Sequence, residues 1–127
     1  MSKKNSKKIF VVDDDEMLSM ALEDYLTRKT LHEVHLFSTG EECLKHLRDQ
    51  PDIIILDYHL NSVTKDAENG VKILEHIKKL KRDVQVIMLS SQDAYSVAIQ
   101  TITRGAEEYV IKDEQAFEKI AAICNAY

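Results

Sequence analysis

Proline, glycine and cysteine are all scarce in this chain of 127 residues, which holds one proline, three glycines and two cysteines. With so few turn-forming residues, the sequence has no low-complexity linker, and it shows no internal repeat. The length suffices for one domain with a real core and is too short for two. We therefore expect a single globular domain.

The cysteines and histidines do not form a recognisable metal or disulfide pattern. Cys43 and Cys124 lie far apart, each at an apolar position of a helical pattern. We expect both to be core thiols of a reducing compartment. The five histidines are not paired at zinc-ligand spacing.

Long apolar runs are also missing. No stretch resembles the apolar segment of a signal peptide, and none approaches the roughly 20 apolar residues of a membrane span. We expect a cytoplasmic protein without a membrane contact.

The formal net charge of −5 argues against direct nucleic-acid binding. The first residues run against this sign, because Lys3, Lys4, Lys7 and Lys8 cluster there. We predict that residues 1–7 form a basic, disordered head, with an RNA or membrane contact as the alternative.

The most informative stretch is Pro51–Leu60, which reads PDIIILDYHL. Its four consecutive aliphatic residues, Ile53 to Leu56, are too few for a buried helix, and three of them are β-branched. A continuous apolar strand of this kind is typical of the centre of a parallel sheet. The strand ends in Asp57, so a carboxylate lies at the carboxyl edge of the predicted sheet.

Four further strands are predicted over residues 8–12, 34–37, 84–89 and 108–111. Helical periodicity appears between and after them. The expected inward residues are Leu18, Ala21, Leu22, Tyr25 and Leu26, then Cys43, Leu44 and Leu47, then Ile73, Leu74, Ile77 and Leu80, then Ala94, Val97, Ala98, Thr101 and Ile102, and finally Phe117, Ile120, Ala121 and Cys124. Asp15 and either Ser38 or Thr39 are predicted to begin helices, and Gly105 to end one.

Strands that alternate with helices of this length predict an α/β fold with a five-stranded parallel sheet and right-handed crossovers. Two topologies fit this pattern: a flavodoxin-like doubly wound (βα)5 fold of order 2-1-3-4-5, and a Rossmann-like half-domain. Five strands without a Gly-rich turn favour the first. In that order the first and fifth helices cover one face of the sheet, and the other three helices cover the opposite face.

Chemically useful side chains follow four of the predicted strands. They are Asp13 and Asp14, Asp57, Ser90, and Lys112. Parallel strands bring these residues to one edge, where three crowded carboxylates would repel one another unless a cation joined them. Oxygen ligands favour Mg²⁺, with Mn²⁺ as the alternative. Asp57 could then act as a nucleophile toward a phosphoryl group, with Lys112 and the Ser90 hydroxyl stabilising its oxygens.

These motifs make the chain resemble the receiver domains of two-component response regulators, chemotaxis regulators among them. The matching segments are Val11-Val12-Asp13-Asp14, Leu56-Asp57, Leu89-Ser90, Gly105-Ala106 and Tyr109-Val110-Ile111-Lys112. The resemblance implies that residues 8–127 form a receiver domain. It implies that Asp57 is phosphorylated by a sensor histidine kinase or phosphotransfer protein, and that a downstream effector of unknown identity reads the result.

The resemblance also implies the roles of the other residues. Asp14, Asp57 and the backbone carbonyl of His59 would bind the metal, with Asp13 acting largely through water. Ser90 would turn toward the phosphoryl group while Tyr109 swings inward, so that the face of the fourth helix, fifth strand and fifth helix reaches an active state. The protein would be a monomer or a weak dimer through that face.

Three features depart from the family pattern. Gly70 lies thirteen positions after Asp57, which makes the polar loop over 58–69 unusually long, and Leu60-Asn61 replaces the usual Met-Pro pair. Asp113 follows Lys112 where a proline is common, so a cis peptide bond there is less secure. No second domain follows Tyr127, so we expect a single-domain regulator or a fragment.

Three other functions fit the sequence less well than a phosphoacceptor switch that is not a turnover enzyme. A pseudo-receiver that only binds partners would not need the intact Asp/Asp/Ser/Lys set. An FMN protein would need a Ser/Thr/Gly-rich loop where Asp13, Asp14 and Asp15 stand. A phosphatase with an aspartyl nucleophile would need a second acid two residues after Asp57, where His59 stands.

Overall fold

The computed structural model describes residues 6–60, 69–92 and 94–127. Predictions that concern Lys3, Lys4 and the segment 61–68, Asn61 included, fall outside these residues. The strands are β1 (Lys8–Val12), β2 (Glu33–Phe37), β3 (Ile53–Asp57), β4 (Gln85–Ser90) and β5 (Glu108–Ile111). The helices are α1 (Glu16–Lys29), α2 (Gly40–Lys45), α3 (Gly70–Leu80), α4 (Tyr95–Thr103) and α5 (Ala116–Ala126), with a short 3₁₀ turn, η2, over Leu47–Asp49.

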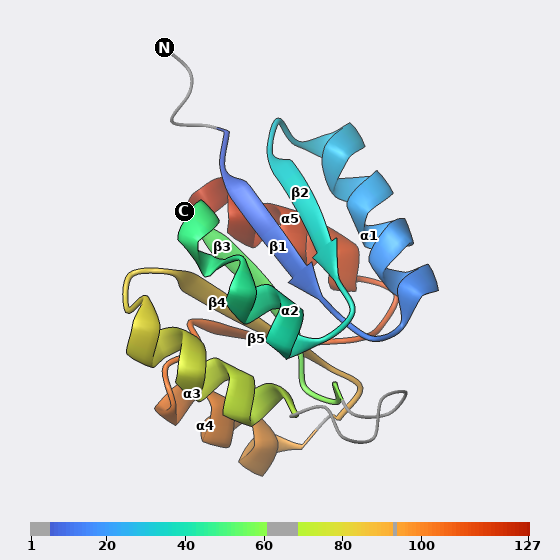
Figure 1. Cartoon of the computed structure of the whole chain (residues 1–127). Helices are drawn as coiled ribbons and strands as arrows, with labels where there is room; N and C mark the ends of the chain where they lie inside the picture. Colours follow the sequence, from blue (N-terminus) through green and yellow to red (C-terminus); the bar gives the residue numbers. More distant parts are fainter. Residues whose placement is uncertain (1–5, 61–68, 93) are drawn as a thin grey trace.

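All neighbouring strands pair in parallel, and the sheet has the order β2-β1-β3-β4-β5. This confirms the flavodoxin-like prediction over the Rossmann-like alternative. In Figure 1 the strand arrows run in one direction, so the carboxyl ends of all five strands lie at one edge of the sheet. The residues that follow β1, β3, β4 and β5 are thereby brought together.

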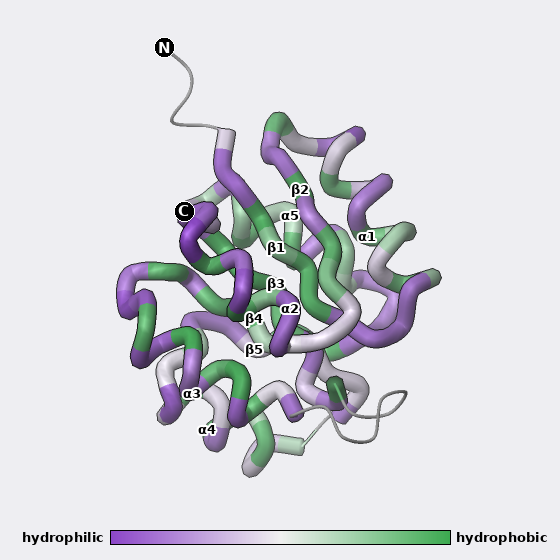
Figure 2. Tube along the Cα trace, in the orientation of Figure 1, coloured by the Kyte–Doolittle hydropathy of each residue, from purple (hydrophilic) through white to green (hydrophobic). Residues whose placement is uncertain are grey.

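The apolar run 53–56 forms the centre of the sheet as predicted. All five residues of β3 are buried, and this strand pairs with β1 on one side and β4 on the other. β2 lies at an edge and is only partly buried along its length. The green interior strands in Figure 2 show this difference, since they are more apolar than the mixed β2.

Two apolar layers cover the sheet. One contains residues of α2 and α3 with alternate residues of the central strands, among them Cys43, Ile73, Ile54 and Met88. The other contains residues of α1 and α5 with the intervening strand residues, among them Leu22, Ile120, Ile55 and Leu89. This is the predicted division of α1 and α5 from α2 and α3 (Figure 1). α4 lies beside α3 in the same view and contacts β5.

The helix ends follow local sequence signals. The Asp15 carboxylate accepts a hydrogen bond from Leu18 N–H at 3.2 Å, and Thr39 Oγ1 accepts one from Glu42 N–H at 3.2 Å. Thr39, and not Ser38, is therefore the N-cap of α2. Gly105 follows α4 with a φ of 111°, a left-handed conformation that glycine adopts at no steric cost.

Periodicity was wrong about three inward residues. Ala21 is exposed, Leu80 is 63% exposed and Ile102 is 44% exposed. Leu80 is the last residue of α3, and Ile102 lies in the last turn of α4. On α1 the buried position is taken by Ser19, whose hydroxyl faces the backbone carbonyl of Asp13 at 3.4 Å.

Both cysteines are buried and free, as predicted, and burial raises the pKa of each thiol to about 12. Both therefore stay protonated at neutral pH. No helix among the described residues is both long and apolar enough to span a bilayer.

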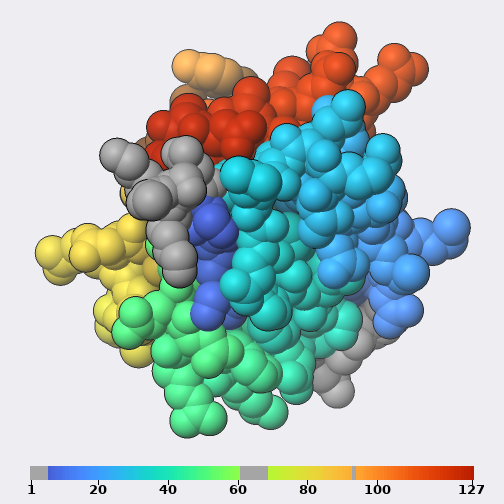
Figure 3. Space-filling model, turned by 90° about the horizontal axis from the view of Figure 1, so that it is seen from above, coloured from blue at the N-terminus to red at the C-terminus, as the bar shows by residue number. Residues whose placement is uncertain are grey.

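Lys7 and Lys8 join the sheet at its amino edge, onto which Figure 3 looks. The Lys7 carbonyl accepts from Glu33 N–H at 2.8 Å, and Lys8 N–H donates to the Asp52 carboxylate at 2.8 Å. These bonds fix β1 between β2 and the segment before β3 from its first residue.

Candidate functional site

The three predicted site residues Asp13, Asp57 and Lys112 meet at the carboxyl edge of the sheet. β1 and β3 are neighbours with Val12 opposite Leu56, so the next residues, Asp13 and Asp57, lie side by side. Lys112 follows β5, beyond β4, and its backbone N–H donates to the Ser90 carbonyl at 2.8 Å. Its long side chain reaches back across β4. The Lys112 Nζ lies 3.2 Å from Asp13 Oδ2 and 3.1 Å from Asp57 Oδ1.

Both carboxylates are almost fully buried, and burial shifts their ionisation. It is the largest cause that raises the pKa of Asp57 to about 7, and the negative charge of Asp13 adds to the rise. Lys112 and the backbone N–H of His59 oppose it. Burial also raises the pKa of Asp13. Asp57 is therefore an acid whose charged form is poorly stabilised unless further positive charge is supplied.

Lys112 stays charged in this setting. Burial alone would lower its pKa, but the charges of Asp13 and Asp57 outweigh burial and raise it. Its side chain is 24% exposed, so the ammonium also borders solvent. It lines a groove of about 300 Å³ with Leu18, Phe117 and other residues of the α1 and α5 side. A small molecule in this groove can therefore reach the ammonium.

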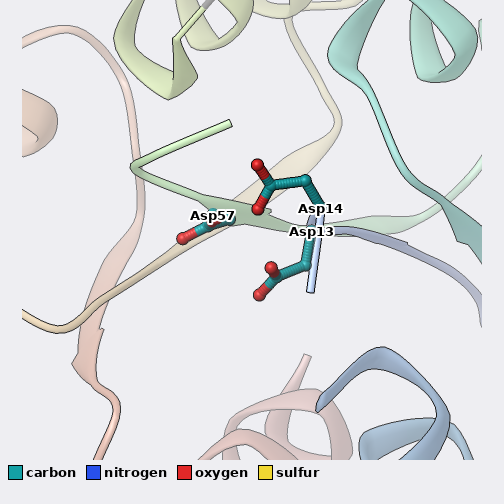
Figure 4. Close-up of side chains that lie close together, drawn as sticks. All are labelled: Asp13, Asp14 and Asp57. Atoms are coloured by element: carbon teal, nitrogen blue, oxygen red, sulfur yellow. The ribbon is translucent and has the colours of Figure 1, made fainter. Parts of the chain in front are cut away.

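Asp14 completes an acidic cluster with Asp13 and Asp57, as Figure 4 shows. One carboxylate oxygen from each of the three lies within 4.8 Å of the others. Two deeply buried oxygens, Asp13 Oδ2 and Asp57 Oδ1, lie at ion-pair distance from Lys112 yet accept no hydrogen bond of good geometry. The Lys112 ammonium lies at ion-pair distance from two of the three carboxylates, Asp13 and Asp57, and an all-oxygen donor set suits Mg²⁺. The residues fit a hard divalent cation.

Local hydrogen bonds hold the first of these carboxylates in place. Asp13 Oδ1 accepts from Asp15 N–H at 2.9 Å, and Asp13 N–H donates to the Phe37 carbonyl at 3.1 Å. Asp13 thus points into the site while its neighbour Asp15 caps α1. Of the three consecutive aspartates, Asp15 therefore caps α1, while Asp13 and Asp14 belong to the acidic cluster.

Ser90 and Tyr109, predicted to act as a switch pair, share one partner that the sequence did not single out. Ser90 is fully buried, whereas Ser91 is exposed, and Ser90 Oγ accepts from Gln92 N–H at 3.0 Å. Tyr109 is half-buried, and its hydroxyl donates to the Gln92 carbonyl at 2.7 Å. Gln92 thus links both residues through its backbone. Only its position, two residues after Ser90, could have indicated this.

His59 lies beside the cluster. Its ring packs edge-on against Tyr58 with the ring centroids 4.8 Å apart, and its Nε2 lies 3.5 Å from Gln92 Nε2. The metal-binding role of its backbone carbonyl stays a prediction. The Lys112–Asp113 peptide bond is trans, since the described residues contain no cis peptide bond.

Comparison with known proteins gives consistent matches along the chain. The profile of the response regulator receiver domain matches residues 9–124. The chain is 37% identical over 108 residues to the two-component response regulator ARR2 of Arabidopsis thaliana, covering 83% of this chain and 15% of that protein. It is 24% identical over 118 residues to the chemotaxis protein CheY of Thermotoga maritima, covering 92% of this chain and 94% of that one.

The solved structures agree. The BeF3-activated receiver domain of DrrB, a Thermotoga maritima protein, superimposes with a TM-score of 0.79 at 27% identity, covering 95% of this chain and 96% of that one. The sheet order and the helix arrangement found here are therefore those of solved receiver domains. The chain corresponds to nearly all of some relatives and to a small part of others.

Proposed function

Because the chain belongs to the response regulator receiver domain family, we propose that Asp57 is its phosphoacceptor and that phosphorylation there switches the protein between two states. The donor is a histidine kinase or a phosphotransfer protein, as expected for this family. The observation that carries the assignment is the placing of Lys112 Nζ 3.1 Å from Asp57 Oδ1, with a second buried carboxylate alongside.

In the transfer step, an oxygen of Asp57 attacks the phosphorus of the donor. An O–P bond forms while the bond to the donor breaks, and the electron pair of that bond leaves with the donor group. Asp57 must be ionised to attack. Because its pKa is raised to about 7, the Asp57 carboxyl is protonated in a fraction of the molecules at neutral pH. Positive charge near Asp57 therefore controls the rate at which it accepts the phosphoryl group.

Asp14, Asp57 and the backbone carbonyl of His59 would hold Mg²⁺, with Asp13 acting through water. When bound, the ion would supply positive charge that keeps the carboxylates ionised and neutralises the phosphoryl oxygens. Lys112 supplies the second positive charge from the β5 side, and the Ser90 hydroxyl would donate to a phosphoryl oxygen after turning away from the Gln92 N–H.

The output surface in this proposal is the face of α4, β5 and α5. Tyr109 lies at its edge with its hydroxyl on the Gln92 carbonyl. If Ser90 turns toward the phosphoryl group, the Gln92 backbone loses a partner, and Tyr109 can move inward. Since Tyr95, Ile99 and Ile102 are exposed on α4, such a shift alters an apolar surface that an effector or a second copy can bind. Physically this is a population shift biased by the added charge.

The chain acts as a switch and not as a turnover enzyme in this account. The residue two positions after Asp57 is His59, which offers no carboxylate to activate water for hydrolysis. The side chains of His59 and Gln92 lie next to each other, and we expect them to limit access of water to the site. We further propose that the protein is cytoplasmic, and that a downstream effector of unknown identity binds its phosphorylated form.

The experiment is to incubate the protein with Mg²⁺ and a small phosphodonor and to measure its intact mass. The wild type should gain the mass of one phosphoryl group, and Asp57→Asn should gain none. Asp24→Asn, an exposed change on α1, is the matched control and should behave as the wild type does. An unchanged wild-type mass would contradict the proposal and favour a binding module that keeps only the fold.

A further inference from the structure

α4 is weakly attached to the rest of the domain. Thr101 is the one buried residue of this helix, and Tyr95 is 83% exposed. The N-cap residue, Ala94, provides no side-chain cap. With so little apolar burial, the position of α4 depends on a small set of polar contacts.

Two of these contacts hold the ends of the α4 region. Before the helix, Tyr109 donates to the Gln92 carbonyl at 2.7 Å. After the helix, Arg104 Nε donates to Glu75 Oε2 of α3 at 2.9 Å. Neither contact involves the strand that carries Asp57.

A third contact involves the residue directly after that strand, and it reaches the middle of the helix. The Tyr58 hydroxyl donates to Gln100 Oε1 at 3.3 Å. This is longer than the roughly 2.7–2.8 Å usual for a hydroxyl donor, so a small displacement breaks it. Tyr58 directly follows Asp57 in the chain.

The backbone of Tyr58 is held firmly enough to convey a movement of Asp57. Its N–H donates to the Leu89 carbonyl at 2.9 Å, and its carbonyl accepts from Gly70 N–H at 3.0 Å. A Cβ at Gly70 would collide with the Asp57 carbonyl oxygen and would lie 2.8 Å from Tyr58 Cα. The ring packs against the apolar layer of α2 and α3. Because the ring and the backbone of Tyr58 are both held in place, a shift of the Asp57–Tyr58 backbone also shifts the Tyr58 hydroxyl.

We propose that Tyr58 tethers α4 through Gln100 in the unphosphorylated protein, and that phosphorylation of the adjacent Asp57 releases this tether. The release rests on the proposed function, whereas the tether itself does not. Tyr58 is a positioning residue in this account. It acts on the middle of α4 independently of the contact between Tyr109 and Gln92.

Amide hydrogen exchange of α4 tests the tether in the unphosphorylated protein. Loss of one long hydrogen bond should accelerate exchange in α4 by roughly two- to fivefold in Tyr58→Phe. Gln100→Met, which keeps the size and helix propensity but removes the acceptor, should do the same. The double variant should match the single ones, because both remove one bond. Unchanged exchange in Tyr58→Phe, or effects that add in the double variant, would overturn the tether.

Tyr25→Phe is the matched control, since this tyrosine lies on α1 and packs against Phe117 on the other face of the sheet. It should leave exchange in α4 unchanged. The release is tested on wild-type protein whose intact mass shows one added phosphoryl group. Its α4 exchange should rise to the level of Tyr58→Phe, and phosphorylated Tyr58→Phe should rise less.

The two proposals can fail separately. If phosphorylated wild type keeps slow exchange in α4, the release is wrong. If no phosphoryl mass is gained at all, the proposed function fails and the release with it, while the comparison of unphosphorylated variants still decides whether the tether exists.

Discussion

The Lys112 ammonium lies 3.1 Å from Asp57 Oδ1, although Asp57 ends β3, Lys112 follows β5, and β4 lies between these two strands. The ion pair therefore spans the strand that ends in Ser90. A change in the charge of Asp57 therefore acts directly on Lys112, at the end of β5, and β5 belongs to the proposed output face.

Removal of this ammonium should separate phosphorylation from its consequence. We expect Lys112→Ala to fold, because the side chain borders solvent and lies outside the apolar layers. The phosphorylated variant should lack the chemical-shift changes that phosphorylation causes in β5 and α5 of the wild type. They can be compared in amide spectra. Equal changes in both proteins would remove Lys112 from the switch.

Replacement of the phosphoacceptor should stabilise the fold at high pH. The folded-state pKa of Asp57 is raised from 3.8 to about 7, so the folded protein binds this proton more tightly than the unfolded chain does. The resulting stability is present at low pH and is lost as pH rises from about 4 through 7. Asp57→Asn should therefore raise the free energy of unfolding by on the order of 2 kcal/mol at pH 8, and by much less at pH 5.

Denaturant unfolding at the two pH values measures this difference. The exposed substitution Asp24→Asn serves as the control and should change stability by no more than about 0.5 kcal/mol at either pH. A gain in Asp57→Asn of the same size at pH 5 and pH 8 would show that burial does not penalise the charged carboxylate.

Added Mg²⁺ should stabilise the folded state, because the acidic cluster exists only there. Thermal unfolding of the wild type should shift upward with increasing Mg²⁺, and the shift should vanish in Asp14→Asn. Asp52→Asn, at the opposite edge of the sheet, should keep the shift. If Asp14→Asn responds to Mg²⁺ as the wild type does, the ion binds elsewhere.

The sequence was sufficient to predict the elements that carry a strong local signal. The run 53–56 identified the central strand, and the aspartates after two adjacent strands identified the acidic edge. The exposure of Leu80 could not be predicted, because periodicity does not show whether the last turn of a helix is covered by a neighbouring element. The burial of Ser19 could not be predicted either, because its hydroxyl faces the Asp13 carbonyl, a contact that periodicity does not show.

The contacts of Gln92 and Tyr58 were beyond sequence reasoning for a different reason. Both depend on how loops direct a backbone carbonyl or a phenol toward another element, and no periodic pattern encodes that direction. The two residues flank the predicted site residues Ser90 and Asp57 in the chain, so proximity was their only signal.

The amino edge of the sheet should respond to acid through His32. This buried ring accepts from Lys7 N–H at Nδ1 (3.0 Å) and contacts Asn125 Oδ1 through Nε2 (2.9 Å). Burial lowers the pKa of His32, with Lys7 acting in the same direction and Asn125 and Asp52 opposing it. A lowered folded-state pKa gives stability that is present above about 6.5 and lost as pH falls through the folded pKa.

A proton on Nδ1 would face the Lys7 N–H, so acidification should free the start of β1. A titration of the His32 ring by NMR should give a pKa below 6.5, and the Lys7 amide should shift over the same range. In His32→Gln that amide should no longer follow this titration. A His32 pKa above 6.5 would contradict the account.

The most direct test of the central claim is to locate the phosphoryl group. Protein treated with Mg²⁺ and a small phosphodonor can be reduced with borohydride, which converts an aspartyl phosphate to homoserine, and then mapped by peptide mass spectrometry. We predict homoserine at position 57 in the wild type and none in protein that was not exposed to the phosphodonor. Homoserine at another aspartate, or at none, would contradict the account.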